Sequence, residues 1–297
     1  MSALLSTLPS RVFLALAASV ALSAAPAQAA ATGELVDLEL VIATDSSGSI
    51  GDEEALVQRQ GIADAFRSEQ LAKVISLGIY GKIVVAYLDW SNQFDNTVVV
   101  DWTVIKDKAT AEGFADQLVN APRTYGRRTS ISSAVVSGME LIEGNAYQGT
   151  RRTIDISGDG PNNFGLPLAP VREEAIGKGI TINGLPIILD GGQFERNFSP
   201  EIDKYYANCV IGGRGAFAIV ARGFDDFSRA VRRKLILEIS GVEPETQFAE
   251  ASSPEPATRL DFAQVRELPP PPGMLRPPAT REQNCDVMQG GFGGFFR

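Results

Sequence analysis

The sequence predicts an α/β protein: a Rossmann-like, doubly wound sheet of six mostly parallel strands with helices on both faces. Two observations support this fold class. Short, continuous apolar runs alternate with segments of helical periodicity from residue 35 to about residue 241. The apolar runs indicate strands that are buried on both faces, which is typical of a parallel sheet covered by helices on either side.

Six apolar runs are expected to form the strands of this sheet. They occupy residues 35–43, 82–89, 96–102, 151–156, 180–189 and 216–221. A short polar segment separates the second run from the third, which is consistent with a hairpin between them. Helix-like segments separate most of the other runs, which favours parallel neighbours.

Five segments carry apolar residues at the spacing of a helix face. They are residues 52–75, 108–119, 129–143, 170–178 and 224–239. Gly179 follows the fourth segment and is a typical helix terminator. In the last segment, four apolar residues lie four positions apart: Phe227, Val231, Leu235 and Ile239. In sheets of this kind, ligands bind beyond the carboxyl ends of the strands.

The composition excludes several classes of function. The chain has no histidine, which removes histidine-dependent acid–base catalysis, Ser-His-Asp triads and most zinc sites. Its 27 basic and 36 acidic residues give a formal net charge of −9. An acidic surface argues against nucleic acid or an anionic membrane as the main partner.

Residues 1–30 have the features of a secretory signal peptide. Arg11 is their only charged residue, an apolar stretch covers residues 12–22, and residues 27–29 fit a cleavage site. The apolar stretch is too short for a convincing membrane helix, and no other stretch reaches about 18 apolar residues. We therefore expect a periplasmic or secreted protein with no stable membrane span after cleavage.

A single domain over residues 34–241 is expected to precede a proline- and glycine-rich tail, residues 242–297, with little regular structure. The two cysteines are Cys209, in the domain, and Cys285, in the tail. An exported protein meets an oxidising environment in which they can pair, and the bond would tie the tail to the domain. Two free thiols are the alternative.

Three separated segments bring oxygen-bearing side chains to the predicted carboxyl edge of the sheet. Asp45, Ser47 and Ser49 follow the first strand, Thr129 opens a helix, and Asp159 follows the fourth strand. Together they offer two carboxylates and three hydroxyls, the oxygen ligands that a hard divalent cation such as Mg²⁺ prefers. Taken singly, each segment is more typical of a helix cap or a turn.

The joint pattern resembles the von Willebrand factor A (VWA) domain with its metal-ion-dependent adhesion site, and within that family a group of exported bacterial single-domain proteins. The Asp-x-Ser-x-Ser motif is matched by Asp45, Ser47 and Ser49, the threonine motif by Thr129, and the Asp-Gly motif by Asp159. The resemblance implies that the serines and Thr129 would ligate the cation directly. The two aspartates would act directly or through water.

The resemblance also implies a binding module and not an enzyme. An unknown protein partner would offer an acidic residue to complete the coordination of Mg²⁺, or of Mn²⁺ or Ca²⁺. Gly158 departs from the family pattern, because many relatives carry threonine there, and this predicts a missing hydrogen bond behind the ligands.

Two alternatives to a binding module remain open. One is a metal-dependent hydrolase or phosphatase with Asp45 as nucleophile. Ser47 then stands where such enzymes usually carry a second aspartate, which argues against this chemistry. The other is a VWA-like domain whose site is purely structural.

Two further sets of charged residues are ambiguous. Asp155 should point away from its strand neighbours, and Arg151 or Arg152 is its expected partner. Arg127 and Arg128 lie beside the proposed site. They either attract an acidic partner or only offset nearby carboxylates.

Overall fold

The computed structural model describes residues 33–92, 94–188, 201–241, 272–278 and 285. The expected signal peptide and most of the expected tail lie outside these residues.

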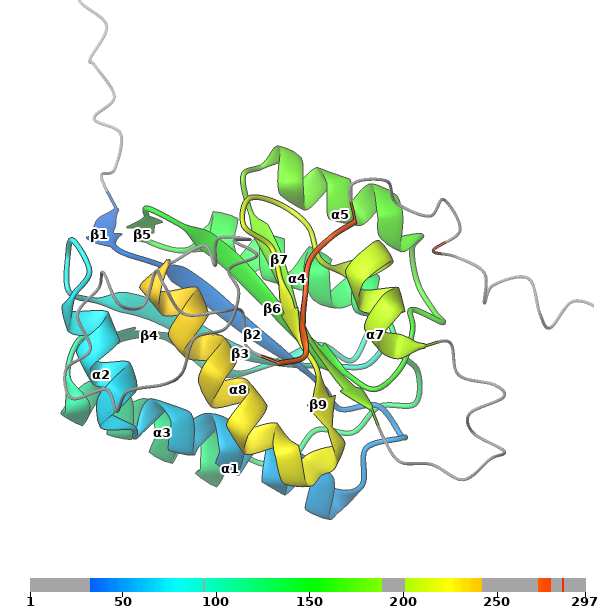
Figure 1. Ribbon diagram of the computed structural model, residues 1–297, viewed down its shortest axis with the longest axis horizontal. Helices are drawn as coiled ribbons and strands as arrows, with labels where there is room; N and C mark the ends of the chain where they lie inside the picture. The colour runs from blue at the N-terminus through cyan, green and yellow to red at the C-terminus, as the bar shows by residue number, and fades with distance from the viewer. Residues whose placement is uncertain (1–32, 93, 189–200, 242–271, 279–284, 286–297) are drawn as a thin grey trace, which may run out of the picture. The chain divides into compact units, whose positions relative to one another are not determined.

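An eight-stranded, mostly parallel sheet forms the centre of the described fold (Figure 1). Its strands are β2 (Glu39–Asp45), β3 (Ile83–Trp90), β4 (Thr97–Ile105), β6 (Arg152–Gly158), β7 (Thr181–Ile188), β8 (Ala218–Ile219), β9 (Ala221–Arg222) and β10 (Met274–Leu275). The order across the sheet is β10-β8-β7-β6-β2-β3-β4, with β9 beside β7. The edge strands β4 and β10 run antiparallel to their neighbours. A small parallel pair, β1 (Glu34–Val36) with β5 (Tyr147–Gly149), forms a second sheet.

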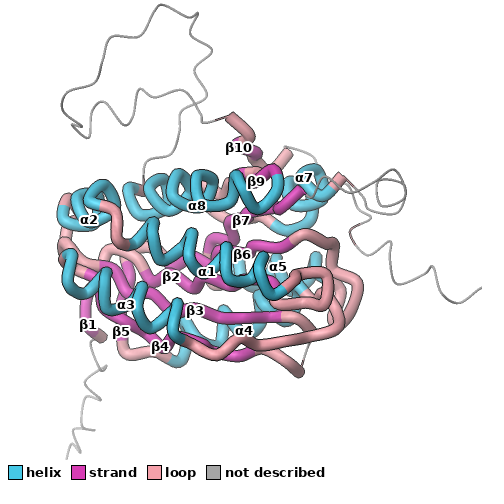
Figure 2. The backbone as a smooth tube through the Cα atoms, turned by 90° about the horizontal axis from the view of Figure 1, so that it is seen from below, coloured by secondary structure: helices cyan, strands magenta, loops and turns pink. Residues whose placement is uncertain are grey.

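Helices cover both faces of the large sheet, as Figure 1 and Figure 2 show. One face carries α1 (Asp52–Phe66), α2 (Glu69–Ser76), α3 (Lys108–Asn120) and α8 (Gly223–Ser240). The other carries α4 (Ile131–Gly144), α5 (Leu168–Gly177) and α7 (Ile202–Tyr205), which continues into the π-helix η1 (Tyr206–Val210). The predicted α/β class is therefore confirmed, with eight strands in the sheet instead of the expected six. None of the described helices is long and apolar enough to cross a membrane.

Two expected elements are each divided by a polar side chain that binds backbone groups. The run 35–43 divides into β1 and β2 because the Asp37 carboxylate accepts hydrogen bonds from the backbone N–H groups of Tyr80 and Lys82. The helical segment 52–75 divides into α1 and α2 at Ser68. The Ser68 hydroxyl donates to Ala65 O (2.6 Å) and accepts from Leu71 N (3.3 Å), so it ends one helix and caps the next.

The structure adds elements that periodicity did not predict. The segment α7–η1 is one, and β10, which lies within the expected tail and pairs with β8, is another. The run 216–221 forms two short strands, β8 and β9, instead of one. Elements of two to five residues are too short to show a period, so contacts elsewhere in the fold decide them.

The expected partner of Asp155 was wrong. Asp155 does point away from Ile154 and Ile156, but its carboxylate lies 2.5 Å from the ammonium of Lys234 on α8. Lys234 also binds Glu238 (2.6 Å), and all three side chains are buried. Burial, and then the charge of Asp155, raise the pKa of Glu238 to about 7.

The two arginines that were expected to pair with Asp155 instead donate hydrogen bonds to carbonyl groups at the C-terminal ends of helices. Arg151 donates to the carbonyls of Glu238 and Ile239 at the end of α8, and Arg152 donates to Lys178 O after α5. Cationic side chains at helix C-termini satisfy carbonyls that have no partner within the helix.

Candidate functional site

The candidate site lies where the winding of the sheet changes direction. Asp45 ends β2, and Asp159 follows Gly158 at the end of the neighbouring strand β6. From β2 the chain continues through α1 and α2 to β3 on one side, and from β6 through α5 to β7 on the other side. This is the switch point at which parallel α/β sheets bind ligands.

The turn after β2 joins the two aspartates through one backbone N–H and a chain of two hydroxyls. Asp45 Oδ1 accepts the backbone N–H of Ser47 (2.7 Å). The Ser47 and Ser49 hydroxyl oxygens are 3.0 Å apart, and the Ser49 hydroxyl donates to Asp159 Oδ1 (3.0 Å). The Ser46 hydroxyl instead donates to Trp90 O (3.1 Å), so this serine lies apart from the hydroxyl chain.

Helix capping does not explain these side chains. The residue that precedes α1 is Gly51, so neither Asp45 nor Ser49 caps that helix. At α4 the cap is Ser130, whose hydroxyl accepts the N–H of Ser133 (3.3 Å). Thr129 therefore does not cap α4, although it precedes the cap by only one residue.

The Thr129 loop and the Asp159 loop are held together by two hydrogen bonds, one to the Asn163 side chain and one between backbone groups. Thr129 N donates to Asn163 Oδ1 (3.1 Å), and Asn163 N donates to Thr129 O (2.9 Å). A Cβ atom built on Gly160 would lie 3.7 Å from Thr129 Oγ1. The Thr129 side chain thus lies against the Asp159–Gly160 turn. All five side chains predicted to form the site come from loops that converge at this edge of the sheet.

The electrostatics of the site are unfavourable without a positive charge. Asp45 is 2% exposed, and its Oδ2 atom is buried with no hydrogen-bond partner. Burial, and then the negative charge of Asp159, raise the pKa of Asp45 to about 8. Burial also raises the pKa of Asp159. Two neighbouring carboxylates that both resist ionisation are stabilised by a cation between or beside them.

The donor set fits a hard divalent cation. Within the described chain, no group of three or more histidine, cysteine, aspartate or glutamate side chains has metal-binding spacing. A cation here would therefore depend on hydroxyl oxygens together with two carboxylates. Oxygen ligands of this kind suit Mg²⁺, Mn²⁺ or Ca²⁺ and offer nothing to a thiophilic metal.

The structure gives a steric reason for glycine at position 158, where many proteins with this motif carry threonine. A Cβ atom built on Gly158 would lie 3.0 Å from Asp45 Oδ2 and 3.2 Å from Trp90 Cζ2. The same position would be 3.0 Å from the hydroxyl of Tyr206 on η1. A threonine here would crowd these three side chains, and each would have to shift by a few tenths of an ångström to make room for it.

Three supporting residues escaped prediction from the sequence. Asn163 holds the Thr129 loop, and Tyr206 approaches the site from an unpredicted element. Arg123 donates to Ile50 O (2.5 Å) and pairs with Asp52, which fixes the turn against the next loop. The two asparagines after Pro161 were a signal for a loop with side chain–backbone bonds, but the sequence does not say which loop they bind.

Arg127 and Arg128 are exposed at the rim of the site. Neither forms an ion pair with any carboxylate in the described part of the chain, and Arg128 lies 5.6 Å over the ring of Phe164. Their positive charges are therefore not neutralised by salt bridges within the described residues.

A family model described as "Protein of unknown function (DUF1194)" matches residues 35–243. No curated protein matches the chain. Among solved structures, the chain is similar to a von Willebrand factor type A protein from Catenulispora acidiphila, with 13% identity and a TM-score of 0.48 over 70% of this chain and 44% of that chain. It is also similar to proximal thread matrix protein 1 from the mussel byssus with a zinc-occupied MIDAS motif (15% identity, TM-score 0.47, 70% of this chain, 49% of that chain).

A third similar structure is the vWF domain of the type V pili tip protein Mfa5 from Porphyromonas gingivalis (11% identity, TM-score 0.44, 73% of this chain, 98% of that chain). This chain thus spans less than half the length of the first two structures. Because the TM-scores are below 0.5, these three similarities carry no argument about function. The function must be inferred from the residues of this chain.

Proposed function

Because the chain belongs to the DUF1194 family, whose description assigns no activity, we propose a function from the geometry of the site. The protein is a VWA-like module that binds a divalent cation at Asp45, Ser47, Ser49, Thr129 and Asp159. It uses that cation to bind a protein partner. Mg²⁺ is the first candidate, and Mn²⁺ and Ca²⁺ are the alternatives.

The observation that supports this proposal is a buried carboxylate, Asp45, beside a half-buried one, Asp159, with the Ser47 and Ser49 hydroxyls between them. Asp45 Oδ2 is buried without a partner, and Asp159 adds a second negative charge. A divalent cation would neutralise this charge and accept lone pairs from the hydroxyl oxygens. We assign Ser47, Ser49 and Thr129 to direct coordination, and the two aspartates to direct or water-mediated coordination.

The partner is proposed to supply a carboxylate. A cation held largely by neutral hydroxyls and water keeps enough positive charge to attract an external acidic group. The exposed charges of Arg127 and Arg128 favour the same kind of ligand. With the expected signal peptide, this partner would be a protein of the cell envelope or the surroundings, and no nucleic acid is involved.

An enzyme is the weaker alternative. A phosphatase that used Asp45 as nucleophile would need a general acid, and Ser47 occupies the position where one is usual. The chain has no histidine to replace it. A purely structural site is the other alternative, and calorimetry that shows no Mg²⁺ binding at millimolar metal would favour it.

The deciding experiment compares the wild type with Asp45→Ala, and uses Asp116→Ala as a matched control. Asp116 is an exposed aspartate on α3 that pairs with Arg67. We expect calorimetry to show Mg²⁺ binding by the wild type and the control but not by Asp45→Ala. We expect envelope proteins to be captured in the presence of Mg²⁺ and released by EDTA. Capture that survives both EDTA and Asp45→Ala would refute the proposal, and phosphate-ester hydrolysis lost in that variant would favour the enzyme.

A further inference from the structure

The hydroxyl of Tyr206 is a buried polar group that the site described above does not yet use. Tyr206 is the first residue of η1 and is fully buried, with its Oη atom unpartnered. A buried hydroxyl without a hydrogen bond is unfavourable, so such groups call for an explanation.

The Tyr206 hydroxyl and the Asp45 carboxylate border the same small space. A Cβ atom built on Gly158 would be 3.0 Å from Tyr206 Oη and 3.0 Å from Asp45 Oδ2. Each of these two atoms is buried and lacks a partner. Trp90 closes the space from a third side, since its Cζ2 atom is 3.2 Å from the same point. Because residue 158 is a glycine, no side chain from this position stands between the two oxygen atoms.

The chemistry of the two groups is complementary. A tyrosine hydroxyl is protonated at neutral pH and donates one hydrogen bond. An ionised carboxylate oxygen has two lone pairs, so Oδ2 can accept from the tyrosine and still face a cation or its water. Groups that hold a metal ligand from behind fix its orientation and strengthen binding.

We propose that Tyr206 is a positioning residue of the cation site: its hydroxyl donates, directly or through one water molecule, to Asp45 Oδ2 across the space beside Gly158. This inference rests on the proposed cation binding. In many relatives a threonine at the position of Gly158 would support the ligands. Here Tyr206, from a π-helix distant in the sequence, is proposed to take that role.

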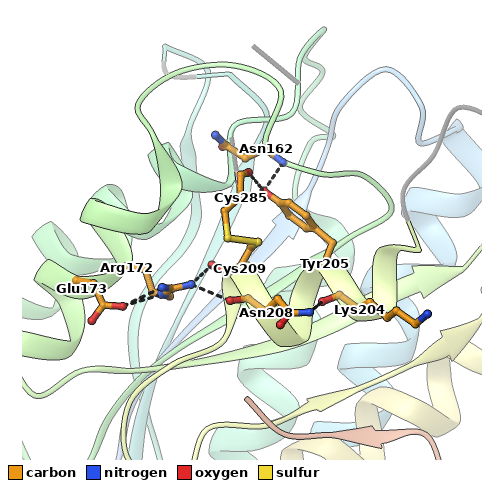
Figure 3. The surroundings of a disulfide bond; sticks show 8 residues. All are labelled: Asn162, Arg172, Glu173, Lys204, Tyr205, Asn208, Cys209 and Cys285. Carbon is orange, nitrogen blue, oxygen red and sulfur yellow. Dashed lines mark hydrogen bonds and ion pairs between the residues drawn. A yellow bond between two sulfur atoms is a disulfide. The ribbon is translucent and has the colours of Figure 1, made fainter. Parts of the chain in front are cut away.

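Figure 3 shows the disulfide and the hydrogen bonds that anchor η1, the helix to which Tyr206 belongs. Cys209, one helical turn later, forms a disulfide with Cys285. The guanidinium of Arg172 on α5 donates to the carbonyls of Asn208 (3.1 Å) and Cys209 (2.7 Å). The segment is therefore anchored at its C-terminal end by one covalent bond and two hydrogen bonds. π-Helical turns of this kind are frequent at functional sites.

The preceding residue ties the same helix to the loop that carries Asp159. The Tyr205 hydroxyl accepts the N–H of Asn162 (3.1 Å) and donates to Cys285 O (3.4 Å), as Figure 3 shows. Tyr205 thus binds the loop that carries Asp159, and Tyr206 places its hydroxyl beside Gly158, next to which Asp45 Oδ2 also lies.

The first test is Tyr206→Phe, which removes only the hydroxyl, with Tyr80→Phe as the matched control at a partly exposed tyrosine. We expect Mg²⁺ affinity, measured by calorimetry, to fall about tenfold in Tyr206→Phe and to stay unchanged in Tyr80→Phe. The melting temperature in EDTA should fall only slightly in Tyr206→Phe, because the variant loses one hydrogen bond to Asp45 Oδ2 and keeps the packing of the ring. A lower melting temperature with unchanged Mg²⁺ affinity would overturn the inference, since it would mark a structural role alone.

The second test uses the shared space. Gly158→Ser alone should weaken Mg²⁺ binding, because the new side chain crowds Tyr206 Oη and Asp45 Oδ2. In a Tyr206→Phe background the serine hydroxyl has room and can replace the lost donor, so the double variant should bind Mg²⁺ more tightly than Gly158→Ser. A double variant no tighter than Gly158→Ser would overturn the shared-space argument.

The same titrations separate this inference from the proposed function. If the wild type binds no Mg²⁺, Mn²⁺ or Ca²⁺, the proposed function itself fails. If the wild type binds and Asp45→Ala does not, but Tyr206→Phe matches the wild type within about twofold, only the role of Tyr206 fails.

Discussion

Thr129 and Asn163 exchange two hydrogen bonds across the candidate site: Thr129 N donates to Asn163 Oδ1, and Asn163 N donates to Thr129 O. One of these bonds uses the asparagine side chain and the other only its backbone. The loop that carries Asp159 therefore sets the position of a hydroxyl that belongs to another loop.

Removal of the Asn163 side chain should loosen this arrangement. In Asn163→Ala, the N–H of Thr129 loses its acceptor, and we expect Mg²⁺ affinity to fall about tenfold. Asn163→Asp keeps an acceptor oxygen at the same place and should retain most of the affinity. Calorimetric titration of both variants checks this, and equal loss in both would show that the hydrogen bond to Thr129 is not the cause.

Asp45 should make the stability of the metal-free protein depend on pH. Its pKa is about 8 in the folded protein and 3.8 without the fold, so the folded state holds its proton more strongly. The stabilisation that the protonated group contributes is complete below the unfolded pKa and is lost as the pH rises through about 8.

Asp45→Asn removes this dependence. In EDTA at pH 8 we expect the variant to melt at a higher temperature than the wild type, and near pH 4 the two should melt together. Added Mg²⁺ should raise the melting temperature of the wild type only. A wild type that is less stable than Asp45→Asn in Mg²⁺ at pH 8 would contradict the assignment of Asp45 to the cation.

The buried ion cluster on α8 should be sensitive to the loss of its only lysine. Lys234→Met leaves Asp155 and Glu238 buried without their cation, and we expect a loss of about 3–5 kcal/mol in the free energy of unfolding. The loss should be smaller at pH 5 than at pH 8, because the Glu238 carboxyl, with its pKa of about 7, is then protonated. Denaturant unfolding at the two pH values measures this. Exposed Lys108→Met should have little effect.

The two arginines at the rim should affect the partner more than the cation. Reversal of Arg127 and Arg128 to glutamate should weaken Mg²⁺-dependent binding of a glutamate-rich peptide about tenfold at low salt, mainly through slower association. Mg²⁺ affinity itself should stay the same or rise, because repulsion of the cation is removed. Arg232→Glu on α8 is the control. An equal loss of peptide binding in this variant would show that the effect comes from the net charge of the protein alone.

Local signals in the sequence predicted much of the fold. The bounds of α3 and α8 lie within one residue of the expected helices, because their apolar periodicity is long and uninterrupted. The breaks at Asp37 and Ser68 could not be predicted in this way. Each depends on one polar side chain that binds backbone groups, and the sequence contains many similar side chains in other roles.

The candidate site shows the same difference between features that the sequence predicts and features that depend on packing. Residue type and order along the chain predicted that Asp45, Ser47, Ser49, Thr129 and Asp159 lie at one edge of the sheet, and the structure brings their segments together there. Their binding of a cation stays a prediction. The residues that support them could not be predicted in this way. Tyr206 reaches the site only because α7 and η1 pack beside β7. The partner of Asp155 depends on α8, which packs on the neighbouring strand β7 and brings Lys234 to Asp155. Both follow from packing across distant parts of the chain.

The pairing of β10 with β8 has a consequence for the order in which this protein matures during synthesis. All residues matched by the family model leave the ribosome before Met274 and Cys285 do. Until then, β8 offers an open edge to other nascent chains, and Cys209 remains a thiol. A truncated version that stops after α8 would keep both features permanently, so it should be more prone to aggregation and to intermolecular disulfides than the full chain.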